Sequence, residues 1–136
     1  MPEAYVLDSY AVLMLLDNEA GADQVQQLLS EAAQNTAQIY MSQINLGEVL
    51  YIIERERGLL NAQKALVAIE QLPIELLSAT KERILKAAHI KATARMSYAD
   101  AFAAAATSEY NASLLTGDPE FSDIKDEISI IWLPKK

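Results

Sequence analysis

Short apolar segments typical of buried strands recur along the chain and are separated by longer segments with helical periodicity. The expected strands are residues 4–8, 38–41, 74–77, 113–116 and 129–133. The expected helices are residues 9–16, 22–34, 42–57, 61–71, 80–93 and 97–110. Ser42, Thr80 and Ser97 stand at the start of three of these helices as N-cap residues, and Gly58 ends the third helix.

This alternation of strands and helices predicts an α/β fold. Strands joined by helical crossovers form a parallel sheet, and right-handed crossovers place helices on both of its faces. We expect a single three-layer domain over residues 1–136 with the strand order 3-2-1-4-5. In this order the first and fourth strands are neighbours at the switch point, where ligands of such sheets bind beyond the carboxyl ends of the strands.

The residue types present narrow the possible chemistry. The chain of 136 residues has no cysteine and one histidine, which excludes disulfides, thiolate catalysis and a cysteine-based or histidine-rich metal site. The longest apolar run, Tyr10 to Leu16, is too short to cross a bilayer, and no basic segment precedes it as in a signal peptide. We therefore expect a cytoplasmic protein without a membrane partner, whose chemistry depends on carboxylates, hydroxyls, amides and a few basic side chains.

Charge is unevenly distributed along the sequence. Nineteen acidic against eleven basic residues give a net charge of −8, which argues against a protein that simply coats nucleic-acid phosphates. No Lys or Arg precedes Arg55, and the densest basic stretch lies between Lys81 and Arg95. This stretch is either a solvated helix face or a local patch that steers phosphates. The candidates for such steering are Arg55, Lys86, Lys91 and Arg95.

Four acidic residues from separate segments are expected to converge at the switch point. Asp8 ends the first strand, and Asp118 follows the fourth. Glu48 lies two turns into the helix after the second strand, and Asp100 lies in the first turn of the helix that leads into the fourth strand. Local roles are open for three of them, because Asp8 and Asp100 suit helix caps and Asp118 suits a turn. Glu48 is harder to explain locally, because seven of the ten residues 44–53 are apolar and an acid in a buried helix needs a partner.

Such a set of carboxylates needs a counter-charge. Two carboxylates a few ångströms apart repel by roughly 4 kcal/mol at an effective dielectric constant of about 20. No basic residue adjoins any of the four acids in the sequence. Oxygen-only donors favour Mg²⁺ or Mn²⁺, and the lack of cysteine disfavours zinc. The four acids therefore predict a site for one or two divalent ions.

The segments around these acids resemble the four acidic motifs of PIN domains, in order and across the whole chain. The segments are residues 5–9 (YVLDS), 45–49 (NLGEV), 97–101 (SYADA) and 115–121 (LTGDPEF). The closest likeness is to the VapC-like toxins of prokaryotic toxin–antitoxin pairs. This resemblance implies a PIN-like fold and a metal-dependent endoribonuclease that hydrolyses RNA phosphodiester bonds with Mg²⁺ or Mn²⁺.

The resemblance also implies roles for individual residues. The catalytic and metal-binding acids would be Asp8, Glu48, Asp100 and Asp118. Thr116 matches a hydroxyl residue that the family has just before its last acid, and Ser9 matches a frequent neighbour of the first acid, so both would support the ligands or contact substrate oxygens. Asn45, one turn before the second acid, either orients that acid or has a surface or capping role. Glu120 falls where many relatives have another polar or acidic residue, and its contribution to the site is open.

The resemblance implies partners as well, and one alternative function remains. Relatives form homodimers and bind an antitoxin, so we expect an RNA substrate, a cognate antitoxin and a second copy of the chain as partners. The alternative is a non-catalytic PIN-fold module that binds RNA or a partner protein. A response regulator needs an Asp after the third strand, and none lies between Asp23 and Asp100. A haloacid-dehalogenase phosphatase needs an acid two residues after Asp8, where Tyr10 stands.

Overall fold

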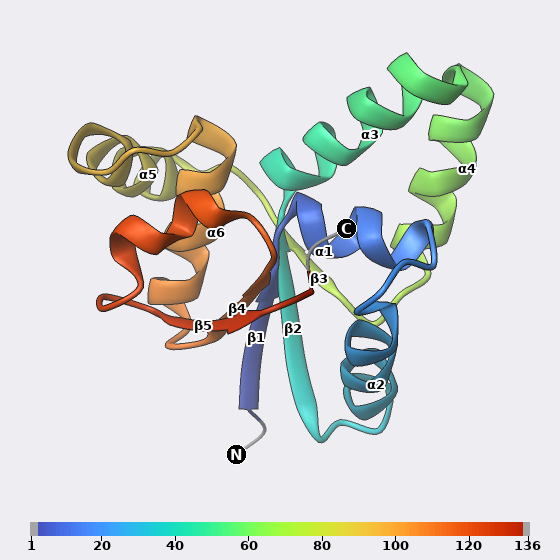
Figure 1. Cartoon of the computed structure of the whole chain (residues 1–136), viewed down its shortest axis with the longest axis horizontal. Helices are drawn as coiled ribbons and strands as arrows, with labels where there is room; N and C mark the ends of the chain where they lie inside the picture. The colour runs from blue at the N-terminus through green and yellow to red at the C-terminus, as the bar shows by residue number, and fades with distance from the viewer. Residues whose placement is uncertain (1–2, 135–136) are drawn as a thin grey trace.

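A computed structural model, shown in Figure 1, describes residues 3–134. The strands are β1(Glu3–Leu7), β2(Ala37–Ser42), β3(Glu75–Leu77), β4(Ser113–Thr116) and β5(Ser129–Trp132). The helices are α1(Ser9–Leu16), α2(Ala22–Ala33), α3(Gln43–Arg57), α4(Leu59–Glu70), α5(Lys81–Thr93), α6(Tyr98–Glu109) and the 3-10 helix η1(Pro119–Ile124). The strands pair in parallel in the order β3-β2-β1-β4-β5, which confirms the predicted fold class and strand order.

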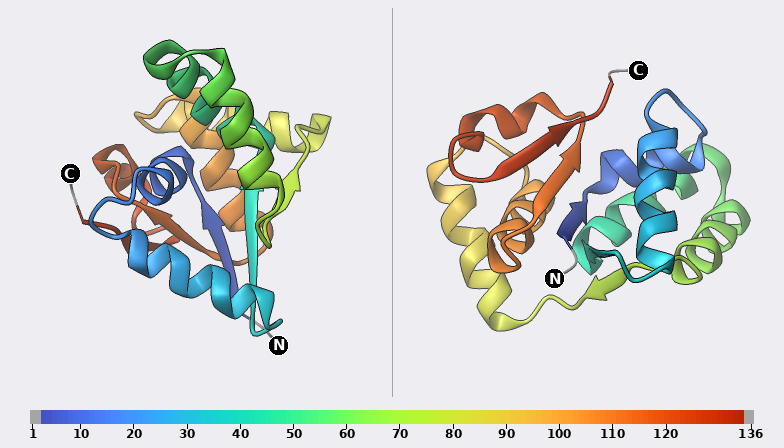
Figure 2. Two further views of the ribbon diagram at one scale, coloured as in Figure 1. Left: turned by 90° about the vertical axis from the view of Figure 1, so that its right-hand side faces the viewer. Right: turned by 90° about the horizontal axis from the view of Figure 1, so that it is seen from below.

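Helices cover both faces of the sheet, with α5 and α6 on one face and α1 to α4 on the other (Figures 1 and 2). Each face has its own apolar core, because successive side chains of a strand point to opposite faces. In β1, Val6 belongs to the core under α6, and Leu7 belongs to the core under α1. Leu114 and Leu115 of β4 alternate in the same way and lie in register with them. The carboxyl ends of β1 and β4 are therefore neighbours between the two helical layers.

Helix α6 owes its position to its small side chains. All residues from Asp100 to Thr107 are buried, and five of these eight are alanine. Short side chains let the helix backbone approach its neighbours closely while filling the interior. Ser97 caps the helix by accepting the backbone N–H of Asp100 on its Oγ at 3.1 Å. The packing of α6 thus places the Asp100 carboxylate in the interior, with 6% of the residue exposed.

Two elements differ from the sequence-based expectation. The turn expected around Asp118 continues into η1, because Asp118 caps this helix and Pro119 occupies its first position. Helix α3 is less buried than expected: its buried residues are Asn45, Val49 and Ile53, and Tyr51 is 49% exposed. Glu48 is half-buried, and the expectation that this apolar helix is largely buried is wrong.

The hairpin of α3 and α4 extends beyond the sheet (Figure 1) and exposes large apolar side chains. These residues are Tyr51, Leu59, Leu60 and Val67. Within residues 3–134, no helix is both long and apolar enough to cross a membrane. A group of exposed large apolar side chains is typical of a surface that contacts a partner protein.

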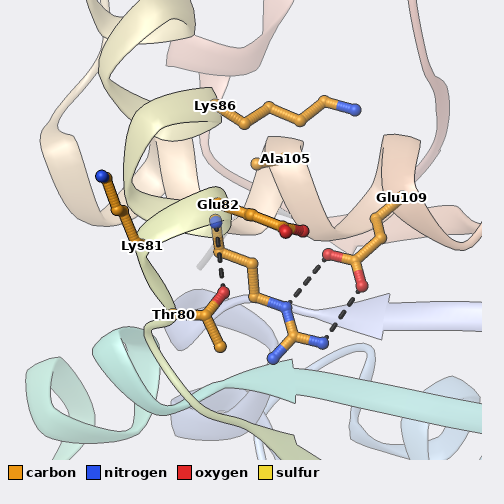
Figure 3. Close-up of a pocket in the computed structure, with 7 residues that line it drawn as sticks. Thr80, Lys81, Glu82, Lys86, Ala105 and Glu109 are labelled. Atoms are coloured by element: carbon orange, nitrogen blue, oxygen red, sulfur yellow. Dashed lines mark hydrogen bonds and ion pairs between the residues drawn. The ribbon is translucent and has the colours of Figure 1, made fainter.

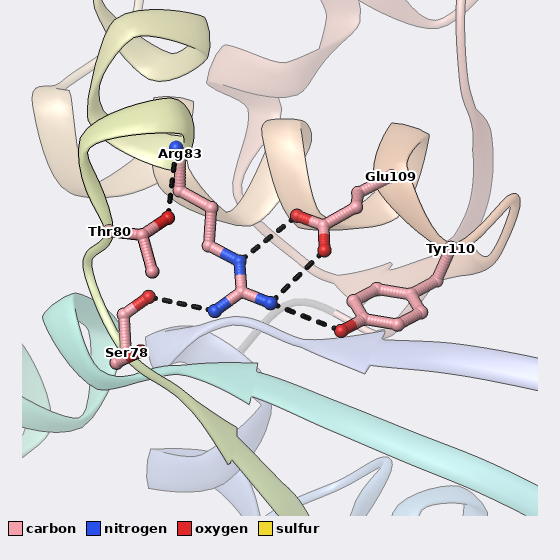
Figure 4. Close-up of polar contacts among 5 residues, drawn as sticks. All are labelled: Ser78, Thr80, Arg83, Glu109 and Tyr110. Carbon is pink, nitrogen blue, oxygen red and sulfur yellow. Dashed lines mark hydrogen bonds and ion pairs between the residues drawn. The ribbon is translucent and has the colours of Figure 1, made fainter.

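One basic residue of the dense stretch on α5 has a structural task. Arg83 donates from Nε and Nη2 to the two carboxylate oxygens of Glu109, at 3.0 and 3.1 Å (Figure 4). It also donates to the Ser78 carbonyl oxygen at 2.9 Å and to the Tyr110 hydroxyl at 3.1 Å. Hydrogen bonding to Arg83 lowers the pKa of Glu109. The Tyr110 ring stacks on that of Tyr40 with centroids 3.9 Å apart, so this cluster ties α5 to the end of α6 and to β2.

Candidate metal centre

The four acids from separate segments line a single pocket of about 310 Å³. Asp8 directly follows β1, and Asp118 follows β4 by two residues. Glu48 reaches the pocket from α3, and Asp100 reaches it from the first turn of α6. Glu120 joins them from η1. Among the residues that the structure describes, the lining of this pocket contains no Lys, Arg or His.

Asp8 is the most deeply placed of these acids, with 1% of the residue exposed. Its Oδ1 accepts the backbone N–H of Ala11 at 2.9 Å and so caps α1. Burial raises the pKa of Asp8 to about 7, although hydrogen bonds from Thr116 and Ala11 act in the opposite direction. The charges of Asp118 and Glu48 raise it further. The Asp8 side chain therefore both caps α1 and lines the acidic pocket.

Asp100, Asp118 and Glu120 form the tightest group of possible metal ligands. Each offers a carboxylate oxygen, and these oxygens all lie within 4.8 Å of one another. Burial raises the pKa of Asp100 to about 8, followed by a hydrogen bond with Glu120 and by the charges of Asp118, Asp8 and Glu48. Without a cation, this arrangement favours at least one bound proton.

Glu120 is the site residue whose role the sequence left open. Asp118 Oδ1 accepts the backbone N–H of Glu120 at 2.9 Å, which closes the first turn of η1. This turn brings the two carboxylates to the same side of the loop, where both line the pocket. The sequence signal was an Asp at the N-cap followed by Pro and Glu, which is a common start of a helix.

Ser9 and Asn45 connect the elements that carry the acids. The Ser9 hydroxyl donates to Glu48 Oε1, which fixes the half-buried carboxylate. Asn45 is fully buried, and its Nδ2 donates to the Ala99 carbonyl oxygen at 3.1 Å and to Ser9 Oγ at 3.4 Å. Its Oδ1 has no hydrogen-bond partner among the described residues. Asn45 thus joins α3 to α1 and to the start of α6, and a surface role is ruled out.

Thr116 and Gly117 fix the loop that carries Asp118. The Thr116 hydroxyl accepts the backbone N–H of Asp118 at 2.9 Å and hydrogen-bonds the Asp8 carboxylate. It is fully buried between the two acids. Gly117 packs against the ring of Tyr10, and a Cβ atom at this position would overlap that ring. The absence of a side chain at Gly117 therefore lets the Asp118 loop approach α1.

The four basic candidates for phosphate steering lie in different places. Lys91 and Arg95 line a groove that adjoins the acidic pocket. Lys86 lines another hollow, between the start of α5 and α6, together with Glu82 and Glu109 (Figure 3). The Arg55 guanidinium lies 5.2 Å from the centre of the Tyr51 ring on α3. The structure thus brings two of the four next to the acids and leaves the other two elsewhere.

The residues present fit a hard divalent ion. All donors in the pocket are oxygen atoms, which Mg²⁺ and Mn²⁺ prefer. Ligand oxygens on opposite sides of a Mg²⁺ ion are about 4 Å apart, because each Mg–O distance is about 2.0–2.1 Å. Oxygens of Asp100, Asp118 and Glu120 lie within 4.8 Å of one another, so these carboxylates are near enough to one another to share one ion. Burial and neighbouring carboxylates raise the pKa of Asp8 and of Asp100, and a bound cation would favour the charged form of both acids.

Solved structures with this fold include proteins of toxin–antitoxin systems. VapBC2 from Rickettsia felis, bound to a promoter DNA fragment, has a TM-score of 0.74 at 15% identity, over 96% of this chain and 99% of that chain. VapC20 from Mycobacterium tuberculosis, described as a sarcin-ricin loop cleaving toxin, has a TM-score of 0.71 at 17% identity, over 97% of this chain and 100% of that chain. A toxin–antitoxin complex from Klebsiella pneumoniae has a TM-score of 0.64 at 14% identity, over 93% and 95%. At these identities the likeness shows the fold.

The sequence comparisons add the family. No curated protein sequence matches the chain significantly. The family model described as PIN domain matches residues 5–127, a range that contains all four acids and Glu120. Because this match spans most of the chain and the observed strand order and neighbours agree with it, the chain belongs to the PIN domain family.

Proposed function

We propose that this protein is a Mg²⁺- or Mn²⁺-dependent endoribonuclease and the toxin of a toxin–antitoxin pair. The observation that carries the proposal is the pocket in which five carboxylates meet. Among the residues that the structure describes, no basic side chain lines this pocket. Such a pocket is costly for a protein unless a cation occupies it, since mutual repulsion and burial both oppose ionisation. The chain belongs to the PIN domain family, whose members include nucleases, and this supports phosphodiester hydrolysis as the reaction at the proposed cation site.

Each side chain of the pocket has a task in this proposal. Asp8, Asp118, Asp100 and Glu48 hold the metal or orient water, and Glu120 adds a further carboxylate from η1. A bound divalent ion supplies Lewis acidity and neutralises the charge that develops during phosphodiester hydrolysis. Ser9 holds the Glu48 carboxylate by a hydrogen bond. Thr116 fixes Asp8 and the Asp118 loop relative to each other.

Asn45 acts through other residues. Its side chain donates to the start of α6 and to Ser9, which in turn donates to Glu48. The amide therefore positions two of the carboxylates without entering the pocket lining. Residues of this kind hold ligands in a productive geometry.

RNA is the proposed substrate because of the fold neighbours. VapC20 is described as a toxin that cleaves the sarcin-ricin loop, and this chain shares its fold over nearly its whole length. The net charge of −8 means that RNA is held by local features and by the metal, since the protein surface as a whole repels phosphates. We expect the protein to act in the cytoplasm, where such a substrate is found.

A cognate antitoxin and a second copy of the chain are the proposed protein partners. Of the structures compared above, one is described as VapBC2 and another as a toxin–antitoxin complex. The exposed apolar side chains of the α3–α4 hairpin, Leu59 and Leu60 among them, offer a surface of the kind that partners cover. Light scattering on the purified chain measures whether it forms the homodimer.

An RNA cleavage assay separates the nuclease from the alternative of a non-catalytic binding module. We expect the purified chain to cut single-stranded or structured RNA in millimolar Mg²⁺ or Mn²⁺. Excess chelator should abolish cleavage, and renewed addition of either ion should restore it, because the carboxylates need a cation to act. RNA that is retarded in a gel but stays intact at every metal concentration would establish the binding module instead.

A further inference from the structure

A groove of about 690 Å³ adjoins the acidic pocket and shares two lining residues with it, Ser97 and Glu120. Lys91 at the end of α5 and Arg95 in the connection to α6 form its basic wall. Asp123 of η1 is the additional acid of this groove. A chain that leaves the acidic pocket past Ser97 and Glu120 therefore enters a groove with two cationic side chains.

The backbone at Arg95 is held in place by Asp123 and by the two residues that follow Arg95 in the chain. Asp123 Oδ2 accepts the backbone N–H of Arg95 at 3.2 Å. The next residue, Met96, is 4% exposed and anchors the connection in the core. The residue after that, Ser97, caps α6 through the N–H of Asp100. The backbone at Arg95 is thus fixed relative to Asp100 although its side chain is exposed.

The charges of Lys91 and Arg95 are available to a ligand. The ion pairs of the described residues join Arg57 to Asp17 and Arg83 to Glu109, and neither includes Lys91 or Arg95. Glu120 has its carboxylate among those of Asp100 and Asp118, where a metal would neutralise it. That leaves Asp123 as the one acid against two cations in this groove.

We propose that Lys91 and Arg95 form a binding site for a phosphodiester of a single RNA strand, next to the phosphodiester that is cleaved. The site rests on the proposed nuclease function, and it assigns the direction in which the strand leaves the acidic pocket. A phosphate between these side chains gains two charge-assisted contacts. These contacts offset the repulsion between an anionic strand and a protein of net charge −8. Lys86 and Arg55 are outside this site, because neither lines the groove.

The test compares Lys91→Gln, Arg95→Gln and the double variant with Lys86→Gln. This control removes one positive charge from α5, the helix of Lys91, but Lys86 lines another hollow. With a short single-stranded RNA substrate, we expect the double variant to raise KM about 10-fold with kcat within about 2-fold of the unmodified chain. The slope of log KM against log salt concentration should fall by about 0.7 for each contact removed. Lys86→Gln should leave KM and the salt slope unchanged.

A neutral methylphosphonate linkage, placed at one position of the substrate at a time, locates the contact. At the adjacent position it should raise KM for the unmodified chain and have no further effect on the double variant, because both changes remove the same interaction. A double variant with the KM and salt slope of Lys86→Gln would overturn the proposal. Additive losses at every linkage position would overturn it as well.

A measurement of RNA binding distinguishes failure of this proposal from failure of the proposed nuclease function. Fluorescence anisotropy with the same RNA is measured on the intact chain if it does not cleave, and in the Asp8→Asn background if it does. Weaker RNA binding in the double variant supports the groove even where cleavage is absent, in which case only the nuclease proposal fails. Equal binding by the double variant and Lys86→Gln contradicts the groove while cleavage by the intact chain still supports the nuclease.

Discussion

Replacing Asp8 with Asn is expected to lower Mg²⁺-dependent RNA cleavage by about 10³-fold or more while the fold survives. The change removes one negative charge from the deepest position of the acidic pocket, and a metal ion contributes several kcal/mol to the stabilisation of such a reaction. The amide oxygen of Asn still accepts the N–H of Ala11, so α1 keeps its cap. Cleavage rates with saturating RNA, together with circular dichroism of the variant, measure both effects.

The matched control is Asp126→Asn, which makes the same chemical change at an exposed position outside the pocket. This variant should cleave RNA at the rate of the unmodified chain. If Asp8→Asn cleaves as fast as the control, Asp8 has no part in catalysis, and the assignment of the pocket as the active site fails.

The second large effect is a loss of stability of the metal-free protein between about pH 4 and pH 8. The pKa of Asp8 rises from its ordinary value of 3.8 to about 7 in the folded chain, and that of Asp100 rises to about 8. Across this range the folded state binds more protons than the unfolded state, so the free energy of unfolding falls as pH rises. For Asp8 alone the rise corresponds to about 4 kcal/mol, all of it lost once the pH exceeds the folded pKa.

Urea unfolding at a series of pH values in chelator measures this loss. The curve of Asp8→Asn should be flatter, because the amide does not titrate. Mg²⁺ or Mn²⁺ should reverse the loss at neutral pH by binding the folded state, by about 2.7 kcal/mol at 100 times the dissociation constant. A metal-free protein whose stability rises steadily from pH 4 to pH 8 would show that these carboxylates do not repel one another in a shared pocket.

The sequence was sufficient to predict the fold and the convergence of the acids because both follow from regular periodicity. Short, largely apolar strands of three to six residues are separated by helices, and this pattern leaves few topologies once crossovers are right-handed. In the strand order that results, β1 and β4 are neighbours, so residues just after them, Asp8 and Asp118, meet at the same edge.

The contributions of Glu120 and Asn45 depend on details that periodicity does not contain. Glu120 enters the pocket because the first turn of the 3-10 helix η1 folds it back toward Asp118, and sequence patterns do not distinguish that turn from an open loop. Asn45 is linked to Ala99 and Ser9, which are 54 and 36 residues away in the chain. Such contacts depend on how helices pack, so only the three-dimensional structure shows that Asn45 is buried and connects three elements.

The positions of the basic residues also depend on helix packing that the sequence pattern does not contain. In the sequence, Lys86, Lys91 and Arg95 belong to one charged stretch, and nothing in their spacing separates them. In the structure, Lys86 lines a hollow with Glu82 and Glu109, whereas the other two line the groove beside the acids. The side of a helix that faces a site depends on its rotation against its neighbours, which packing decides.

The most direct test of the account is anomalous X-ray diffraction from crystals grown with Mn²⁺. We predict an anomalous peak in the acidic pocket, about 2.0–2.2 Å from oxygens of at least two of Asp8, Glu48, Asp100, Asp118 and Glu120. Crystals of Asp8→Asn should show this peak weakened or lost. A pocket without Mn²⁺ at millimolar concentration and neutral pH, or Mn²⁺ bound only elsewhere on the protein, would contradict the claim that these carboxylates form a metal site.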